Sequence, residues 1–349
     1  MRATILPWHD TAWRQLQALR ARLPHAILFH GNPGIGKTSF AGAFASSLLC
    51  ENRTPGGYAC GTCLSCGWFD QYSHPDYRRI RPEVLDGDGS EGEDDNSEVT
   101  ETKKSSKAVK APSKDIRIEQ IRALGNFMNL STHRQGKRVV LLYPAEAMNS
   151  TSANALLKTL EEPPPDTVFL LVSNSPDRVL PTILSRCRQF ALPMPSHAQA
   201  LAWLEAQKVT NAETWLAEQG GAPLTALALA GAGARDAQDE LLAMLGRPSV
   251  ESALKTAERL QKSSSVDLVV CLQRWMHDLC SLKLSGKLRY YPAYRTVLFE
   301  LADKISQVTL LQYIGQLVQR RAIAEHPLSA KLFIEDMLLD YTQLFSQEV

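Results

Sequence analysis

The residues best suited to chemistry near the start of the chain are Gly31, Asn32, Pro33, Gly34, Ile35, Gly36, Lys37 and Thr38. They fit the pattern G-x-x-x-x-G-K-[ST], after an apolar run of strand length and before apolar residues at helical spacing. Such a loop wraps phosphates with backbone N–H groups, while its lysine reaches the β- and γ-phosphates and its threonine offers Mg²⁺ a hydroxyl. We therefore predict a nucleotide site rather than a chance glycine-rich turn, and leave open whether ATP, ADP or neither is bound.

Hydrolysis needs a further group, an acid at the end of a neighbouring strand that holds Mg²⁺. The strand expected at 138–143 ends in Tyr143-Pro144 instead of an acidic pair. Glu146 follows two residues later, and we expect the proline to displace it from the site. The loop is thus predicted to hold phosphate without cleaving it.

Four cysteines, Cys50, Cys60, Cys63 and Cys66, follow the pattern C-x9-C-x2-C-x2-C. Thiolates at this spacing can surround one tetrahedral Zn²⁺, and nearby glycines allow the tight turns required. An iron–sulfur cluster is the main alternative. We expect a structural zinc. The alternative hypotheses are that the module is a nucleic-acid-binding knuckle, or that His74 replaces one of the cysteine ligands.

Two further residues could act on phosphate. Arg186, within Ser185-Arg186-Cys187, could serve as an arginine finger in trans, stabilising phosphate bound to another subunit. Asn174, just after an apolar run at 168–172, could position a water near the γ-phosphate. The structural alternatives are that Arg186 forms a surface ion pair and that Asn174 is a turn residue.

The elements that must position these residues alternate between strand and helix up to about Leu192, which is typical of an α/β sheet with phosphate sites at its strand ends. Helical patterns alone follow. The expected fold is therefore α/β plus all-α, with an α/β domain at 1–195 carrying the zinc module at 50–66, and helical domains at 196–235 and 236–349. Residues 83–114 are predicted to form a disordered insertion, since nine acids and five lysines stand there among few apolar residues. It is either an acidic docking segment or a tolerated surface insertion.

Composition excludes several classes of protein. The 349 residues carry a net charge of only +1, too little for a polybasic nucleic-acid binder. Residues 83–114 contribute a net charge of −4, so the rest of the chain carries +5. Such a mildly basic protein is suited to act next to DNA without binding it tightly by itself. The sequence has no apolar run of membrane-spanning length, and its first ten residues lack the apolar core expected of a secretory signal. The odd cysteine count does not suggest a disulfide framework. We expect a cytoplasmic protein with no membrane partner.

Taken in order, five features resemble clamp-loader subunits of the AAA+ family. They are the phosphate loop, the four-cysteine insertion, the run 154–164 (NALLKTLEEPP), Asn174, and Ser185-Arg186-Cys187. The resemblance is specific from Trp8 to about Leu192 and covers the rest in outline only. It implies a RecA-like P-loop domain, a helical lid domain, and a C-terminal helical collar domain through which subunits assemble into a pentamer.

Within that family the chain resembles the bacterial delta-prime branch more than the motor branch (gamma/tau). Motor subunits carry Asp-Glu where this chain has Tyr143-Pro144, and a lid arginine that Gly221-Ala222-Pro223-Leu224 lacks. The delta-prime branch has no ATPase activity of its own, and the arginine matching Arg186 completes a neighbouring motor subunit's ATP site. The implied partners are gamma/tau, the delta subunit, the sliding clamp and primed DNA, within the DNA polymerase III holoenzyme. This chain departs from many such subunits by keeping Lys37-Thr38.

Two other functions stay open at this stage. One is an active AAA+ ATPase motor of gamma/tau type, and the other is a zinc-dependent nucleic-acid-binding module with a vestigial phosphate loop. The missing acid counts against the first, and the near-neutral charge counts against the second.

Overall fold

The chain divides into two units, Met1–Met194 and Pro195–Val349, in the computed structural model. The structure describes residues 5–86, 112–129, 132, 136–231, 235–324 and 329–346. The division lies one residue from the predicted end of the α/β domain. The further division predicted at 235 stays a prediction.

The first unit is built on a five-stranded sheet in the order β2-β3-β4-β1-β5. All of its strand pairs are parallel. The strands are β1 (Ala26–His30), β2 (Tyr77–Ile80), β3 (Arg138–Leu142), β4 (Thr167–Ser173) and β5 (Arg188–Ala191). The three central strands are almost wholly buried, as expected where helices cover both faces of a parallel sheet. The α/β class is thus confirmed.

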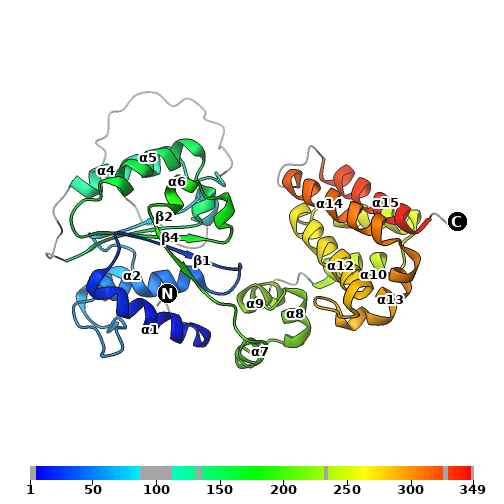
Figure 1. Cartoon of the computed structure of the whole chain (residues 1–349), viewed down its shortest axis with the longest axis horizontal. Helices are drawn as coiled ribbons and strands as arrows, with labels where there is room; N and C mark the ends of the chain where they lie inside the picture. The colour runs from blue at the N-terminus through cyan, green and yellow to red at the C-terminus, as the bar shows by residue number, and fades with distance from the viewer. Residues whose placement is uncertain are drawn as a thin grey trace, which may run out of the picture. The chain divides into compact units, whose positions relative to one another are not determined.

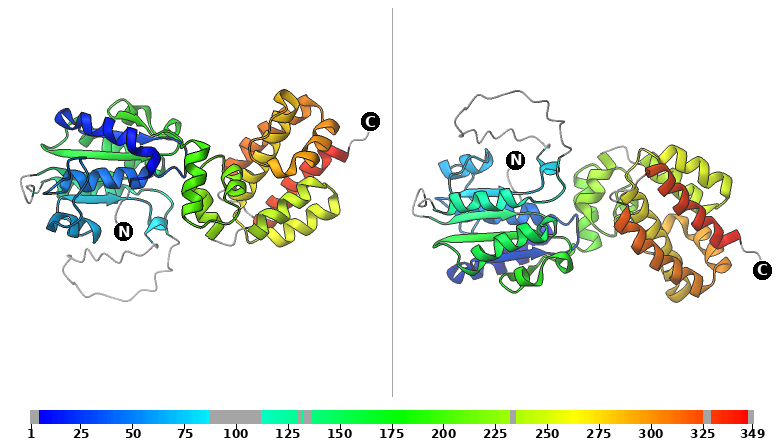
Figure 2. Two further views of the ribbon diagram at one scale, coloured as in Figure 1. Left: turned by 90° about the horizontal axis from the view of Figure 1, so that it is seen from below. Right: turned by 90° about the horizontal axis from the view of Figure 1, so that it is seen from above.

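Alternate residues of the central strands face two separate apolar layers. Ile27 and Phe29 pack with α1 (Asp10–Ala18) and α2 (Lys37–Leu49), while Ala26 and Leu28 face the opposite layer. That second layer contains α4 (Ile118–Asn129), α5 (Ser150–Glu161) and α6 (Pro181–Leu184). Figures 1 and 2 show the two helical layers on either side of the sheet. The period of two along each strand makes both faces apolar.

Short elements complete this unit: η1 (Pro7–His9), η2 (Leu19–Arg22), α3 (Leu64–Asp70), η3 (Glu83–Leu85), η4 (Ala145–Ala147) and η5 (Pro176–Arg178). Two strands, β2 and β5, were not recognised individually in the sequence. Both lie at sheet edges, and two of the four residues in each are arginine or glutamine, so they lack the apolar run that marks a central strand.

The predicted disorder of 83–114 is wrong at both ends of that segment. Glu83 begins η3, and its carboxylate Oε2 accepts a hydrogen bond from the Ser113 N–H at 3.0 Å. The Val84 N–H donates to the Ser113 carbonyl at 3.2 Å, and Arg117 pairs with Glu83 at 2.8 Å. These contacts join the two ends of the insertion to the fold. Residues 87–111 lie outside the described part of the chain.

The second unit is all-helical in the part that the structure describes. Its helices are α7 (His197–Ala206), α8 (Ala212–Glu218), α9 (Pro223–Gly231), α10 (Arg235–Gly246), α11 (Val250–Leu260), α12 (Ser265–Ser285), η6 (Pro292–Tyr294), α13 (Arg295–Lys304), α14 (Gln307–Ile323) and α15 (Ala330–Ser346). One apolar cluster joins α7 to α9, and a larger one joins α10 to α15 around the fully buried Trp275. In the described residues we find no helix long and apolar enough to cross a bilayer.

Candidate functional site

The phosphate loop connects β1 to α2 at the carboxyl edge of the sheet. Its glycines are required by geometry: Gly34 and Gly36 have φ of 73° and 92°. Gly31 has φ of 147°, and a Cβ there would lie 2.6 Å from the Leu192 carbonyl oxygen. The loop therefore has the form that the motif predicts, with its backbone at the start of α2.

Lys37, the first residue of α2, is buried, and its Nζ donates to the carbonyl of Asn32 within the same loop at 2.6 Å. Burial lowers the pKa of Lys37 to about 8, and the nearby Glu146 carboxylate opposes that shift. Thr38 follows it and is half-buried. The lysine thus retains a positive charge at neutral pH close to where the loop would hold phosphate.

Glu146 corrects one sequence expectation, because it is not displaced from this edge of the sheet. The turn η4 carries it from the end of β3 to the end of β4, where its Oε1 accepts a hydrogen bond from the Asn174 N–H at 3.0 Å. Strands β3, β4 and β1 are neighbours in the parallel sheet, so Glu146 lies at the same edge of the sheet as Lys37. The sequence analysis named Glu146 but expected the proline two positions earlier to displace it from the site.

Asn174 directly follows β4, whose last residue, Ser173, pairs in register with His30 at the end of β1. The asparagine is exposed and stands beside the phosphate loop at the same sheet edge. This is a position from which its side chain could orient a water. Its proposed sensor role is still a prediction.

Arg186 lies just beyond α6 and is held in place by three hydrogen bonds. Its Nη2 pairs with Glu161 Oε1 at 2.5 Å, and its Nη1 donates to the Thr182 carbonyl at 2.9 Å and to Ser185 Oγ at 3.3 Å. The side chain is 34% exposed. The arginine is therefore accessible but restrained, and Glu161 is a partner that the sequence did not identify.

The register of the sheet places Arg186 away from the phosphate loop of its own chain. Arg188, at the start of β5, pairs with Ile27, near the start of β1, whereas the loop begins after the other end of that strand. The four residue steps from Ile27 to Gly31 span about 13 Å. Arg186 thus belongs to the amino edge of the sheet and the phosphate loop to the carboxyl edge.

The four predicted metal ligands converge. The Sγ atoms of Cys50, Cys60, Cys63 and Cys66 all lie within 4.8 Å of one another. Two opposite pairs, Cys50–Cys63 and Cys60–Cys66, are each 3.9 Å apart. A tetrahedral zinc with Zn–S bonds of about 2.3 Å requires S–S separations of about 3.8 Å. The four thiols are therefore placed to hold one tetrahedrally coordinated metal ion.

Local structure brings these cysteines together. Cys50 caps the carboxyl end of α2, the same helix that begins at the phosphate loop, and Cys63 caps the amino end of α3. Hydrogen bonds from the Thr62 backbone and side chain, and from the Cys63 N–H, lower the pKa of the Cys60 thiol to about 5. His74 is not part of the cluster: its Nδ1 accepts from the Asp76 N–H, and its Nε2 lies 3.3 Å from Ser65 Oγ.

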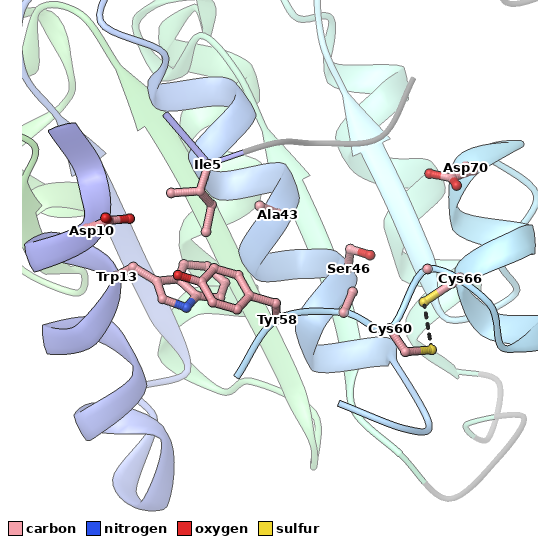
Figure 3. A pocket seen from close by; sticks show the side chains of 11 residues that line it. Ile5, Asp10, Trp13, Ala43, Ser46, Tyr58, Cys60, Cys66 and Asp70 are labelled. Atoms are coloured by element: carbon pink, nitrogen blue, oxygen red, sulfur yellow. Dashed lines mark hydrogen bonds between the residues drawn. The ribbon is translucent and has the colours of Figure 1, made fainter. Parts of the chain in front are cut away.

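The cysteine module packs on α1 through one aromatic pair. Trp13 stacks on Tyr58 with ring centroids 5.0 Å apart, and its Nε1 donates to the Gly56 carbonyl at 3.0 Å. A cavity of about 380 Å³ lies beside this pair, and Figure 3 shows Cys60 and Cys66 on its opposite wall. The module is thus connected to α1 and α2.

His9 is a second residue that the sequence did not single out. It is fully buried beside Phe40, with ring centroids 5.2 Å apart, and neither ring nitrogen has a hydrogen-bond partner among the described residues. Burial, with a smaller contribution from the charge on Lys37, lowers the pKa of His9 to about 4. This imidazole is therefore neutral at physiological pH.

Comparison with known proteins gives consistent matches. A family model described as "DNA polymerase III, delta subunit" matches residues 8–196. The chain is 35% identical to a Pseudomonas aeruginosa protein named DNA polymerase III subunit delta', over 98% of each chain. It is 31% identical to the Yersinia pestis protein of the same name, over 98% of this chain and 95% of that one. A Haemophilus influenzae DNA polymerase III subunit tau/gamma is 30% identical over 84% of this chain and 38% of its own.

Proposed function

Because this chain belongs to the family of DNA polymerase III delta' subunits, we propose that it is a non-hydrolysing, stator-like subunit of the sliding-clamp loader. In this role it works with gamma/tau motor subunits and a delta subunit to load the clamp onto primed DNA in the cytoplasm. Its own phosphate loop binds ATP or ADP without turnover, and its four cysteines hold a structural zinc.

The observation that carries the proposal is the separation of Arg186 from the phosphate loop across the sheet. An arginine at the amino edge lies at the opposite end of the strands from a nucleotide at the carboxyl edge, so its accessible guanidinium suits phosphate on a neighbouring subunit. Glu161 and the Thr182 carbonyl restrain that guanidinium, which reduces the entropy lost when it engages phosphate. We assign Arg186 the role of an arginine finger in trans.

The test uses a clamp loader reconstituted from this chain with gamma/tau and delta subunits of the same organism. Arg186→Ala should lower clamp-dependent ATPase activity by up to about 10³-fold, or by less where other sites of the ring remain active. Arg188→Ala, an exposed arginine two residues away, is the matched control and should retain activity. Unchanged ATPase activity and clamp loading with Arg186→Ala would remove the finger role.

The motor alternative is tested with the isolated chain. A non-hydrolysing subunit should turn over no ATP in the presence of primed DNA. Turnover that disappears in Lys37→Ala would instead identify an active motor. Glu146, the acid that lies at the edge of the phosphate site, makes this measurement worthwhile.

A further inference from the structure

The carboxylate of Glu146 has one oxygen whose purpose the fold does not explain. Oε1 accepts the Asn174 N–H at 3.0 Å, but Oε2 is buried and has no hydrogen-bond partner among the described residues. A buried acceptor without a partner is destabilising, because it loses its hydration on folding and gains no hydrogen bond in return. A purely structural bond to Asn174 would not require that second oxygen to be kept from water.

The surroundings of this oxygen are those of the phosphate site. Parallel strands β3, β4 and β1 are neighbours, so the residues after them meet at one edge of the sheet. Glu146 follows β3, Asn174 follows β4, and the phosphate loop follows β1. The Lys37 ammonium donates to the Asn32 carbonyl within the loop, and the Glu146 carboxylate opposes the lowering of the Lys37 pKa by burial. The carboxylate of Glu146 therefore shares the sheet edge of the phosphate loop, while the lysine is engaged within the loop.

A magnesium ion is the ligand that best matches a carboxylate oxygen and a threonine hydroxyl beside a phosphate loop. Mg²⁺ takes oxygen ligands, keeps several waters, and binds through one or two carboxylates together with the phosphates of its nucleotide. Thr38 supplies the hydroxyl that the loop motif assigns to the ion. A strand-terminal acid is absent at Tyr143-Pro144, so Glu146 is the acid that the described residues bring closest to filling that role.

We propose that Glu146 replaces the missing strand-terminal acid and holds the Mg²⁺ of a nucleotide bound to this chain, directly or through one water. The inference rests on the nucleotide site of the proposed function and specifies how that site works. Hydrolysis also needs a group that positions the attacking water. Because Oε1 of Glu146 already accepts the Asn174 N–H, this carboxylate has a single oxygen left for the ion and none for activating a water.

The experiment measures equilibrium binding of fluorescently labelled ADP to the full chain, in Mg²⁺ and in EDTA. We expect Mg²⁺ to raise the affinity of the native chain at least about tenfold, and Glu146→Gln to reduce that gain to about twofold or less. Glutamine keeps an oxygen for the Asn174 N–H, so the variant should melt as the native protein does. Affinity in EDTA should stay the same or rise, because a negative charge near phosphate has been removed.

Two further variants keep the proposal falsifiable. Thr38→Val removes the hydroxyl that is the other predicted Mg²⁺ ligand, and it should also reduce the increase in ADP affinity that Mg²⁺ produces. Glu119→Gln, an exposed glutamate of α4, is the matched control and should bind as the native chain does.

Two results would overturn the inference in different ways. A full Mg²⁺ gain in Glu146→Gln would remove Glu146 from the site while leaving nucleotide binding intact. Failure of the native chain to bind ADP or ATP would overturn the nucleotide site and this inference together. The role of Arg186 is measured in the assembled loader and would be unaffected by either result.

Discussion

Removing the metal from the four-cysteine cluster should destabilise the first unit of the chain specifically. The cluster connects the end of α2 to the start of α3, and the same module supplies the partners of Trp13, namely Tyr58 and the Gly56 carbonyl. Four thiolates without an ion repel one another when ionised, so the loop that holds them should open. The contacts with Trp13 should weaken with it.

The size of this effect follows from the linkage between metal binding and folding. An ion present at 1,000 times its dissociation constant stabilises the folded state by about 4.1 kcal/mol. In a unit of this length, each kcal/mol changes the melting temperature by about 2–4 °C. Complete chelation is therefore expected to lower the melting temperature of the first unit by about 8–16 °C.

The assay is calorimetry of the full chain before and after chelation, with metal content measured by mass spectrometry. One zinc per chain is expected, and Cys66→Ser should reproduce the effect of chelation because Cys66 is a buried member of the predicted ligand set. Cys280→Ser, a half-buried cysteine of α12 outside the cluster, is the control and should keep both the zinc and the melting temperature.

Three results would refute the reasoning. The first unit could melt at the same temperature after chelation, or the purified chain could carry iron with sulfide in place of zinc. Chelation could also lower DNA affinity without changing stability, which would favour a nucleic-acid-binding role for the cluster.

Two further predictions concern buried polar groups. The pKa of His9 is lowered from 6.5 to about 4 in the folded protein, so on acidification the unfolded chain is protonated first. The contribution of neutral His9 to the free energy of unfolding is therefore present above pH 6.5 and is lost as the pH falls toward 4. Urea unfolding should show a loss of about 2 kcal/mol between pH 6.5 and 5 that His9→Phe largely abolishes; equal slopes for both proteins would contradict this. Tyr341 accepts from Trp275 Nε1 at 2.9 Å and donates to the Leu245 carbonyl at 2.7 Å. Tyr341→Phe should therefore lower the unfolding free energy of the second unit by about 2–4 kcal/mol, and an unchanged denaturation midpoint would disprove the importance of these bonds.

The sites that could be predicted from sequence are those whose parts are close along the chain. The phosphate loop is defined by residues 31–38, and its ligand groups are mostly backbone N–H groups whose geometry the glycines allow. The cysteine cluster spans Cys50 to Cys66 and needs only local turns to close. The central strands and most helices were predictable for the same reason, because periodicity is a local property.

Edge strands and insertion boundaries were harder to predict. β2 and β5 owe their conformation to pairing with a neighbouring strand more than to their own apolar content. Likewise, the contacts of Glu83 with Ser113 and Arg117 bring together residues on the two sides of an acidic segment, and composition alone cannot reveal such pairing.

By itself, the sequence determined which chemical groups this protein carries: a phosphate loop, four clustered thiols, and Arg186 within a Ser-Arg-Cys motif that resembles the clamp-loader family. Only the tertiary structure decided how these groups are directed. The strand order brings Glu146 and Asn174 to the edge where Lys37 lies, and the parallel register leaves Arg186 at the opposite edge. The physical reason is that strand order and register depend on contacts between residues far apart in the chain, which no local pattern encodes.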